Sequence, residues 1–108
     1  TYLPRIASGE WRMQSMAVTE PGTGSDTTRL TTTAIKRGDR YVVNGQKVWI
    51  SRVQHSDLMV LLARTTPLSQ VTRKSQGLSV FIVDSLSHST FTNVSVQHWT
   101  MCANQFTL

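Results

Sequence analysis

Short apolar stretches, separated by turn-forming residues, follow one another along the chain. The predicted strands among them are residues 13–18, 30–36, 58–63, 78–83, 91–96 and 105–108. Residues 30–36 include three consecutive threonines, a β-branched composition that disfavours a helix. Residues 58–63 and 78–83 are nearly all apolar, as is typical of strands buried on both faces. The pattern predicts an all-β domain, a small β-barrel of short antiparallel strands.

Turn signals define a further pair of strands in the middle of the chain. Arg37-Gly38-Asp39 separates residues 30–36 from residues 41–43. Asn44-Gly45 then precedes residues 47–51, and this dipeptide best fits a two-residue type I′ turn. We therefore predict a hairpin of residues 41–43 and 47–51. In the second of these strands, Trp49 and Ser51 would face opposite to their neighbours.

The length of 108 residues suits one domain with a single hydrophobic core. Apolar side chains within the predicted strands are assigned to packing inside the barrel. They are Leu30, Val42, Leu58, Val60, Leu62, Leu78, Val80, Ile82 and Val94.

The first residues differ from the rest, because residues 6–10 are typical of the end of a helix with a glycine stop. We expect residues 1–11 to be the end of a preceding helical domain and residues 12–108 to be the β-barrel domain. The chain stops inside a predicted strand. Residues 65–76 form a polar loop about as long as compact domains tolerate without a function.

The formal charge of +5 and a pI near 10.2 raise nucleic acid or an anionic ligand as partners. The 11 Lys and Arg are spread along the chain without a long basic run, which disfavours nucleic acid. A polyanionic small molecule fits scattered positive charge equally well.

Cysteine, histidine and hydropathy patterns exclude several other classes. A single cysteine, Cys102, rules out an internal disulfide, and His55, His88 and His98 lack a metal-ligand spacing, so no metal site is expected. No window is long and apolar enough to span a membrane, and the N-terminus lacks a signal-peptide pattern. We expect a soluble intracellular protein.

The segment VTEPGTGSD, residues 18–26, admits two interpretations. Proline and glycine occur in ordinary surface turns for backbone reasons alone. Alternatively, the glycines let backbone N–H groups approach a phosphate and the hydroxyls add donors. Its composition alone does not separate a turn from a ligand loop.

Four motifs together resemble the middle domain of the acyl-CoA dehydrogenases. They are MAVTEPGTGSD at residues 16–26, YVVNGQKVWIS at 41–51, LAR at 62–64 and GLSVFIV at 77–83. Their order and spacing cover nearly the whole chain. The resemblance implies a β-barrel domain between two all-helical domains. It also implies oxidation of an acyl-CoA thioester to trans-2-enoyl-CoA, in which a carboxylate removes the α-proton and FAD accepts a hydride.

The resemblance assigns residues 16–26 to flavin and thioester binding. Met16, Val18 and Thr19 would line the isoalloxazine, Thr19 through its hydroxyl. Ser25 would reach both the pyrophosphate and the bound acyl-CoA. Ala17 and Gly24 belong to the same implied FAD-binding set. Three further residues of the segment, Glu20, Pro21 and Asp26, are interpreted as turn residues.

The resemblance assigns the other half of the flavin site to Trp49, Ile50 and Ser51. By residue type alone, Trp49 is more typical of a core than of a cofactor contact. In the family, the tryptophan packs on the flavin and a hydroxyl two residues later lies near the reactive nitrogen. Many relatives carry threonine where this chain has Ser51, and the hydroxyl is retained.

Basic residues outside these motifs remain open to two interpretations. Arg73 and Lys74 in the long loop would contact the phosphates of coenzyme A, or would belong to a solvated loop. Arg52, directly after the Trp-Ile-Ser motif, has the same two interpretations.

The sequence contains no match to the family's catalytic base. Its only glutamates are Glu10, in the expected helix, and Glu20, in the predicted turn. We therefore expect a fragment of an enzyme that is inactive alone, with the base in a following helical domain. The complete enzyme is expected to be a homo-oligomer that passes electrons to an electron-transfer flavoprotein. It would be cytoplasmic in a bacterium, and mitochondrial or peroxisomal in a eukaryote.

Two alternatives remain. One is the middle domain of an acyl-CoA oxidase or a related flavin oxidase, in which oxygen accepts the electrons. The other is a basic β-barrel that binds single-stranded nucleic acid, which predicts aromatic side chains interleaved with basic ones along a groove. The three tryptophans, Trp11, Trp49 and Trp99, are widely spaced, which argues against such a groove.

Overall fold

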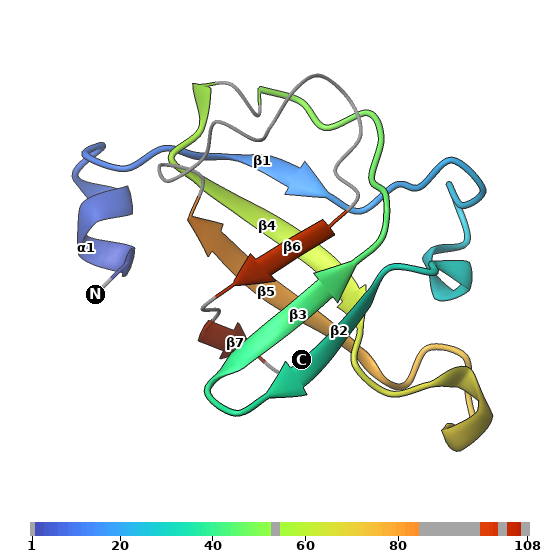
Figure 1. The fold of residues 1–108 in the computed structure, drawn as a ribbon. Helices are drawn as coiled ribbons and strands as arrows, with labels where there is room; N and C mark the ends of the chain where they lie inside the picture. The colour runs from blue at the N-terminus through green and yellow to red at the C-terminus, as the bar shows by residue number, and fades with distance from the viewer. Residues whose placement is uncertain (1, 53–54, 85–97, 102–103, 107–108) are drawn as a thin grey trace.

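The computed structural model describes residues 2–52, 55–84, 98–101 and 104–106, and these are mostly β-strand (Figure 1). The elements are α1 (Tyr2–Ala7), β1 (Met13–Ala17), β2 (Thr33–Arg37), β3 (Arg40–Asn44), β4 (Leu58–Arg64), β5 (Leu78–Asp84), β6 (His98–Met101) and β7 (Asn104–Phe106). Short 3-10 helices lie at Thr27–Arg29 and Leu68–Gln70. The predicted all-β class is confirmed. The predicted strand at residues 91–96 lies outside the described residues, and β6 was not predicted.

The strands form one sheet in the order β6-β3-β2-β4-β5-β7, and β1 pairs with β4 beside this path. The pairings of β4 with β1 and with β2 are parallel, so the prediction of antiparallel strands is wrong there. A parallel pair needs a long crossover, and the β2–β3 hairpin and residues 45–57 provide it between β1 and β4. Among the described strands the sheet is open, with β6 and β7 at its edges, so closure into a barrel stays a prediction.

The β2–β3 hairpin turns at Gly38 and Asp39, where Gly38 has a φ of 62°. The predicted turn at Asn44-Gly45 is wrong: β3 ends at Asn44, and residues 45–50 are not a strand. A Cβ on Gly45 would lie 2.6 Å from the Thr32 Cα, closer than real Cβ atoms approach. Glycine stands at position 45 because the chain passes directly over Thr32, and no hairpin turn is made there.

The hydrophobic core is formed by side chains of β1 to β5, and its residues differ in part from the predicted core residues. Its buried residues are Ala17, Ala34, Val43, Met59, Leu61, Ala63, Phe81 and Val83. Leu30 and Leu58 are buried as predicted. The other described residues assigned to packing, which are Val42, Val60, Leu62, Leu78, Val80 and Ile82, are only half-buried. Because side chains alternate along a strand, the prediction placed the wrong face of β3, β4 and β5 inward. Val94 lies outside the described residues.

Helix α1 lies to one side of the sheet in Figure 1. It ends at Ala7, and Gly9 follows with a φ of 79°, consistent with a glycine stop. The Arg5 guanidinium lies 4.5 Å from the centre of the Trp11 ring. That residues 1–11 end a preceding helical domain stays a prediction. In the described part of the chain no helix could cross a membrane.

Candidate functional site

Two segments far apart in the sequence run side by side, and we call residues 15–20 and 47–51 the paired segments. The Val48 N–H donates to the Thr19 carbonyl at 2.9 Å. At the other end, the Ser15 hydroxyl donates to the Ser51 carbonyl at 3.0 Å. These contacts bring together the two sets of residues that the sequence assigned to flavin binding.

The first paired segment presents alternate side chains to the core and to solvent. The Ala17 side chain is fully buried in the core, and its predicted place in the FAD-binding set stays a prediction. Met16 is 62% exposed, and its register partner on β4 is Val60. Val18 and Thr19 are half-buried. The solvent-accessible side chains of this segment are therefore Met16 and, in part, Val18 and Thr19.

The second paired segment exposes the Trp49 indole. Trp49 is 83% exposed and has a φ of 59°, the left-handed region that non-glycine residues seldom adopt. Ile50 packs against the core, and Ser51 is exposed. Although these residues form no strand, Trp49 and Ser51 are the more exposed positions, as predicted. Trp49 thus combines a large exposed apolar side chain with a rarely populated backbone conformation.

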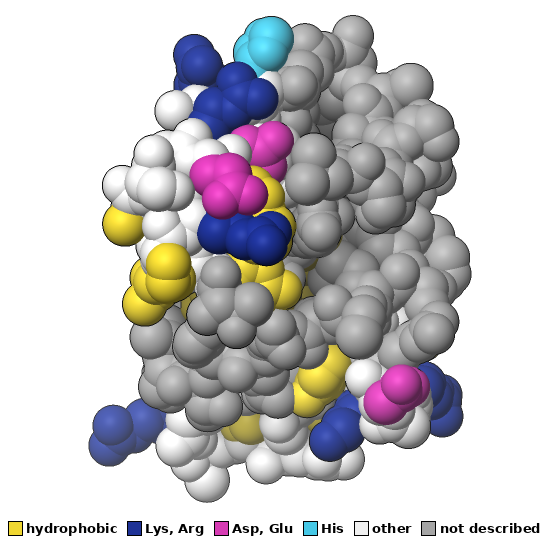
Figure 2. All heavy atoms as spheres, turned by 90° about the vertical axis from the view of Figure 1, so that its left-hand side faces the viewer, with side chains coloured by type: hydrophobic (Ala, Val, Ile, Leu, Met, Phe, Trp, Pro, Cys, Tyr) yellow, Lys and Arg dark blue, Asp and Glu magenta, His cyan; other side chains and the backbone are white. Residues whose placement is uncertain are grey.

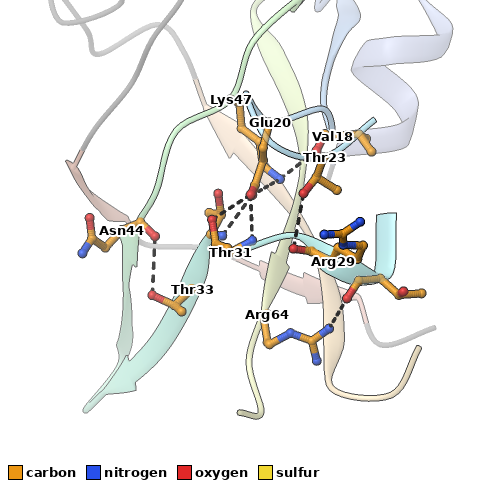
Figure 3. A network of polar contacts seen from close by, with 11 residues as sticks. Val18, Glu20, Thr23, Arg29, Thr31, Thr33, Asn44, Lys47 and Arg64 are labelled. Atoms are coloured by element: carbon orange, nitrogen blue, oxygen red, sulfur yellow. Dashed lines mark hydrogen bonds and ion pairs between the residues drawn. The ribbon is translucent and has the colours of Figure 1, made fainter. Parts of the chain in front are cut away.

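A buried ion pair joins the paired segments to each other (Figure 3). The Lys47 Nζ lies 2.9 Å from the Glu20 Oε1, and their side chains are 0% and 3% exposed. Lys47 also donates to the Val18 carbonyl at 2.9 Å. The Glu20 carboxylate accepts further hydrogen bonds from the Thr31 N–H at 2.7 Å and the Thr32 N–H at 2.9 Å. These contacts fix Val18 and Lys47 relative to each other.

The ionisation of this pair follows from its surroundings. Burial alone raises the pKa of Glu20, but hydrogen bonds from Thr31, Thr32 and Lys47 outweigh it and lower the pKa to about 2. Burial lowers the pKa of Lys47, and the Glu20 carboxylate opposes that shift. Glu20 also makes the predicted turn, since its backbone pairs with that of Thr23. Sequence reasoning missed the ion pair, although each of its charges lies within a motif.

The loop that follows Glu20 is open to solvent. Gly24 and Ser25 are exposed, and a Cβ on Gly24 would meet nothing within 4 Å. Asp26 accepts a hydrogen bond from the Thr28 N–H at 3.2 Å and caps the 3-10 helix Thr27–Arg29, which agrees with its interpretation as a turn residue. The protein's own packing therefore gives no reason for glycine at position 24.

Arg73 and Lys74 are both exposed in the loop of residues 65–77. The hydrogen bond from the Thr28 hydroxyl holds the pKa of Asp26 below its usual range, and the charges of Arg29 and Lys74 lower it further. Lys74 lies near this turn, because the Arg64 Nη2 donates to both the Thr28 and the Lys74 carbonyl. Arg52 differs, because its Nε donates to the Gln14 Oε1 at 2.8 Å.

On the side of the molecule that lies at the left of Figure 1, basic and acidic side chains adjoin (Figure 2). Arg5 pairs with Glu10 at 3.7 Å, and Arg12 pairs with Asp57 at 3.2 Å. Charge of mixed sign does not favour the long polyanion that the nucleic-acid alternative requires.

Comparisons with known proteins find relatives over most of the chain. Residues 15–107 match the family model for the acyl-CoA dehydrogenase middle domain. An acyl-CoA dehydrogenase of Mycobacterium tuberculosis is 49% identical over 82 residues, which are 76% of this chain and 20% of that protein. The crystal structure of a Geobacillus kaustophilus acyl-CoA dehydrogenase matches 84% of this chain and 23% of that one, with 41% identity and a TM-score of 0.72. A glutaryl-coenzyme A dehydrogenase in complex with glutaryl-CoA matches 77% of this chain and 20% of that one, with 34% identity and a TM-score of 0.66. The chain spans about a fifth of the length of these proteins.

Proposed function

The chain belongs to the acyl-CoA dehydrogenase family as its middle domain, and from this premise we propose that it forms one wall of a flavin and acyl-CoA site. The enzyme that contains it would oxidise an acyl-CoA thioester to the trans-2-enoyl-CoA. The observation that carries the proposal is the pairing of residues 15–20 with residues 47–51, which places Met16, Thr19, Trp49 and Ser51 in adjacent segments.

The residues of the paired segments fit FAD. An isoalloxazine has a broad apolar face and a polar edge, and it needs apolar surface beside hydrogen-bonding groups. Met16 and Trp49 provide exposed apolar surface, while Thr19 and Ser51 provide hydroxyls. When bound, FAD supplies the acceptor for the hydride that leaves the acyl chain. The indole of Trp49 would hold the ring in place, and the Thr19 hydroxyl would donate to its polar edge.

The loop at Gly24 and Ser25 fits an anionic group. Space is open around Gly24, so its N–H can approach a phosphate that a side chain would keep away. The exposed Ser25 hydroxyl adds a donor beside it. We assign this loop to the FAD pyrophosphate and the acyl-CoA. Arg73 and Lys74 would bind the phosphates of coenzyme A.

The catalytic base would come from outside the described residues. A general base needs a pKa near the working pH and a path to the substrate proton. Glu20 is buried in an ion pair with a pKa of about 2, and Glu10 is exposed beside Arg5. Neither glutamate suits the role. Family membership also supports closure of the sheet into a small barrel, a homo-oligomeric enzyme and an electron-transfer flavoprotein as electron acceptor.

The proposal is tested with the enzyme that contains this chain, purified with FAD. Anaerobic addition of a saturated acyl-CoA should remove the visible absorbance of oxidised flavin and yield the enoyl-CoA. A panel of straight, branched and cyclic acyl-CoA thioesters covers the substrate class. Failure of every thioester to reduce the flavin would refute the proposed activity. Rapid oxygen consumption during turnover would replace the electron-transfer flavoprotein with oxygen as acceptor.

A further inference from the structure

Arg64, the last residue of β4, is 6% exposed, and within the described part of the chain its hydrogen bonds all go to backbone carbonyls. Its Nη2 donates to Thr28 O and to Lys74 O, each at 3.0 Å, and its Nη1 donates to Gln76 O at 2.9 Å. Figure 3 shows the guanidinium aimed at the segment that contains Arg29. Among the described residues no carboxylate pairs with it. One buried cation therefore joins two segments of backbone, the turn at Thr28 and the loop that contains Lys74 and Gln76.

This arrangement constrains two loops at once. Because Thr28 O and Lys74 O accept from the same nitrogen, they lie within two hydrogen-bond lengths of each other. The guanidinium is planar and permanently charged, so it holds its acceptors in a fixed fork that a lysine cannot reproduce. Arg64 thus binds the loop of residues 65–77 to the turn just after Ser25.

The loop has an internal support of its own. The Gln76 Oε1 accepts from the Thr72 hydroxyl at 2.8 Å and from the Arg73 N–H at 3.1 Å. Arg64 binds the carbonyl of the same Gln76. The backbone at Arg73 and Lys74 is therefore set by two linked contacts, one buried and one exposed.

We propose that Arg64 is a positioning residue for acyl-CoA: it holds Arg73 and Lys74 beside Ser25 so that both loops meet one phosphate-bearing ligand. This inference rests on the proposed function, which supplies the ligand. The low exposure of Arg64 and its all-carbonyl contacts exclude direct contact with the phosphates as its role. Without Arg64 the basic loop would sample many conformations, and binding would have to order it.

The test uses the FAD-loaded enzyme that contains this chain, with coenzyme A as the probe in calorimetric titration. Arg64→Lys keeps the charge and loses the fork, and should weaken coenzyme A binding about tenfold. Gln76→Ala, at an exposed position, should weaken it about threefold without endangering the fold. Gln70→Ala is the matched control, because Gln70 is exposed in the same loop and its backbone N–H, which the substitution keeps, donates to the Pro67 carbonyl. It should bind coenzyme A as the parent does.

Flavin binding provides a second readout. A merely structural role of Arg64 would weaken flavin binding as well as coenzyme A binding. In Arg64→Lys and Gln76→Ala, the visible spectrum and retention of FAD should match the parent while coenzyme A affinity falls. Unchanged coenzyme A affinity in Gln76→Ala and in any Arg64→Lys enzyme that retains flavin would overturn the inference. Loss of flavin in parallel with coenzyme A in both variants would also overturn it, as a general structural role. If the parent enzyme binds no coenzyme A, the proposed function itself fails. The panel of thioesters detects that failure independently of the Arg64 and Gln76 variants.

Discussion

Lys47 and Glu20 form a buried ion pair that connects the two paired segments, with 2.9 Å between the Lys47 Nζ and the Glu20 Oε1. The pair lies one residue from Thr19 and two residues from Trp49 along the chain. Its charges leave water on folding, a cost that their mutual attraction and the hydrogen bonds to Glu20 offset. The ion pair fixes the relative position of the segments that would hold the flavin.

We expect Lys47→Met to destabilise the chain by about 3 to 5 kcal/mol, because it leaves the Glu20 carboxylate buried without its partner. The double variant Lys47→Met/Glu20→Gln removes both charges and should recover part of that loss. Urea denaturation of the parent, both single variants and the double variant measures the coupling. Additive effects in this cycle would contradict a coupled pair.

Stability should fall in acid because of Glu20. Its pKa is about 2 in the folded chain against 4.5 for the ordinary group, so folding favours the ionised form. The contribution is complete above about pH 4.5 and is lost as the pH falls towards 2, with a total of about 3 kcal/mol. Urea denaturation at a series of pH values from about 6 to about 2 measures this contribution to the free energy of unfolding. The Lys47→Met/Glu20→Gln double variant should lack this part of the pH dependence.

The exposed indole of Trp49 should contribute to flavin binding and little to folding. Trp49→Ala should change the free energy of unfolding by no more than about 0.5 kcal/mol. In contrast, Phe81→Ala in the core should cost about 3 to 5 kcal/mol. In the FAD-loaded enzyme, Trp49→Ala should weaken flavin retention while Trp11→Ala leaves it unchanged. A large loss of stability with unaltered flavin affinity would place Trp49 among the structural residues.

Replacement by alanine should affect stability differently at two glycines. At Gly45 the added Cβ would meet the backbone of Thr32, so Gly45→Ala should destabilise by about 1 to 3 kcal/mol. At Gly24 nothing lies within 4 Å, so Gly24→Ala should leave stability within about 1 kcal/mol. If a phosphate approaches Gly24, its alanine variant should nevertheless bind FAD or coenzyme A more weakly. Thermal unfolding and titration with the two ligands separate these effects.

The sequence predicted most of the strands because their apolar stretches are short and bounded by turn residues. It failed where contacts distant in sequence decide the outcome. Asn44-Gly45 carries the local signal of a hairpin turn, but the chain there passes over Thr32 and Lys47 enters the interior. In β4 and β5 both faces are apolar, so alternation could not identify Met59, Leu61 and Phe81 as the inward residues.

The candidate site could be predicted from the sequence only through resemblance to a known family. Residue type alone favoured a core position for Trp49, whereas the structure exposes it. The Glu20–Lys47 pair joins positions 27 residues apart, and the Ser15–Ser51 contact between the paired segments joins positions 36 residues apart. Local patterns carry no information on which distant segment will lie alongside. The contacts of Arg64 could not be predicted for the same reason. Its partners are backbone carbonyls, which every residue type carries.

Among the described strands β1 pairs only with β4, and this has a consequence for the order in which the domain folds. A ribosome delivers β1 long before β4, and until β4 emerges β1 has no strand to join. The β2–β3 hairpin, whose strands are adjacent in sequence, can form during that interval. The β1 edge of the domain would therefore be completed late, and nascent chains stalled before residue 58 should expose Met16 and its neighbours to chaperones.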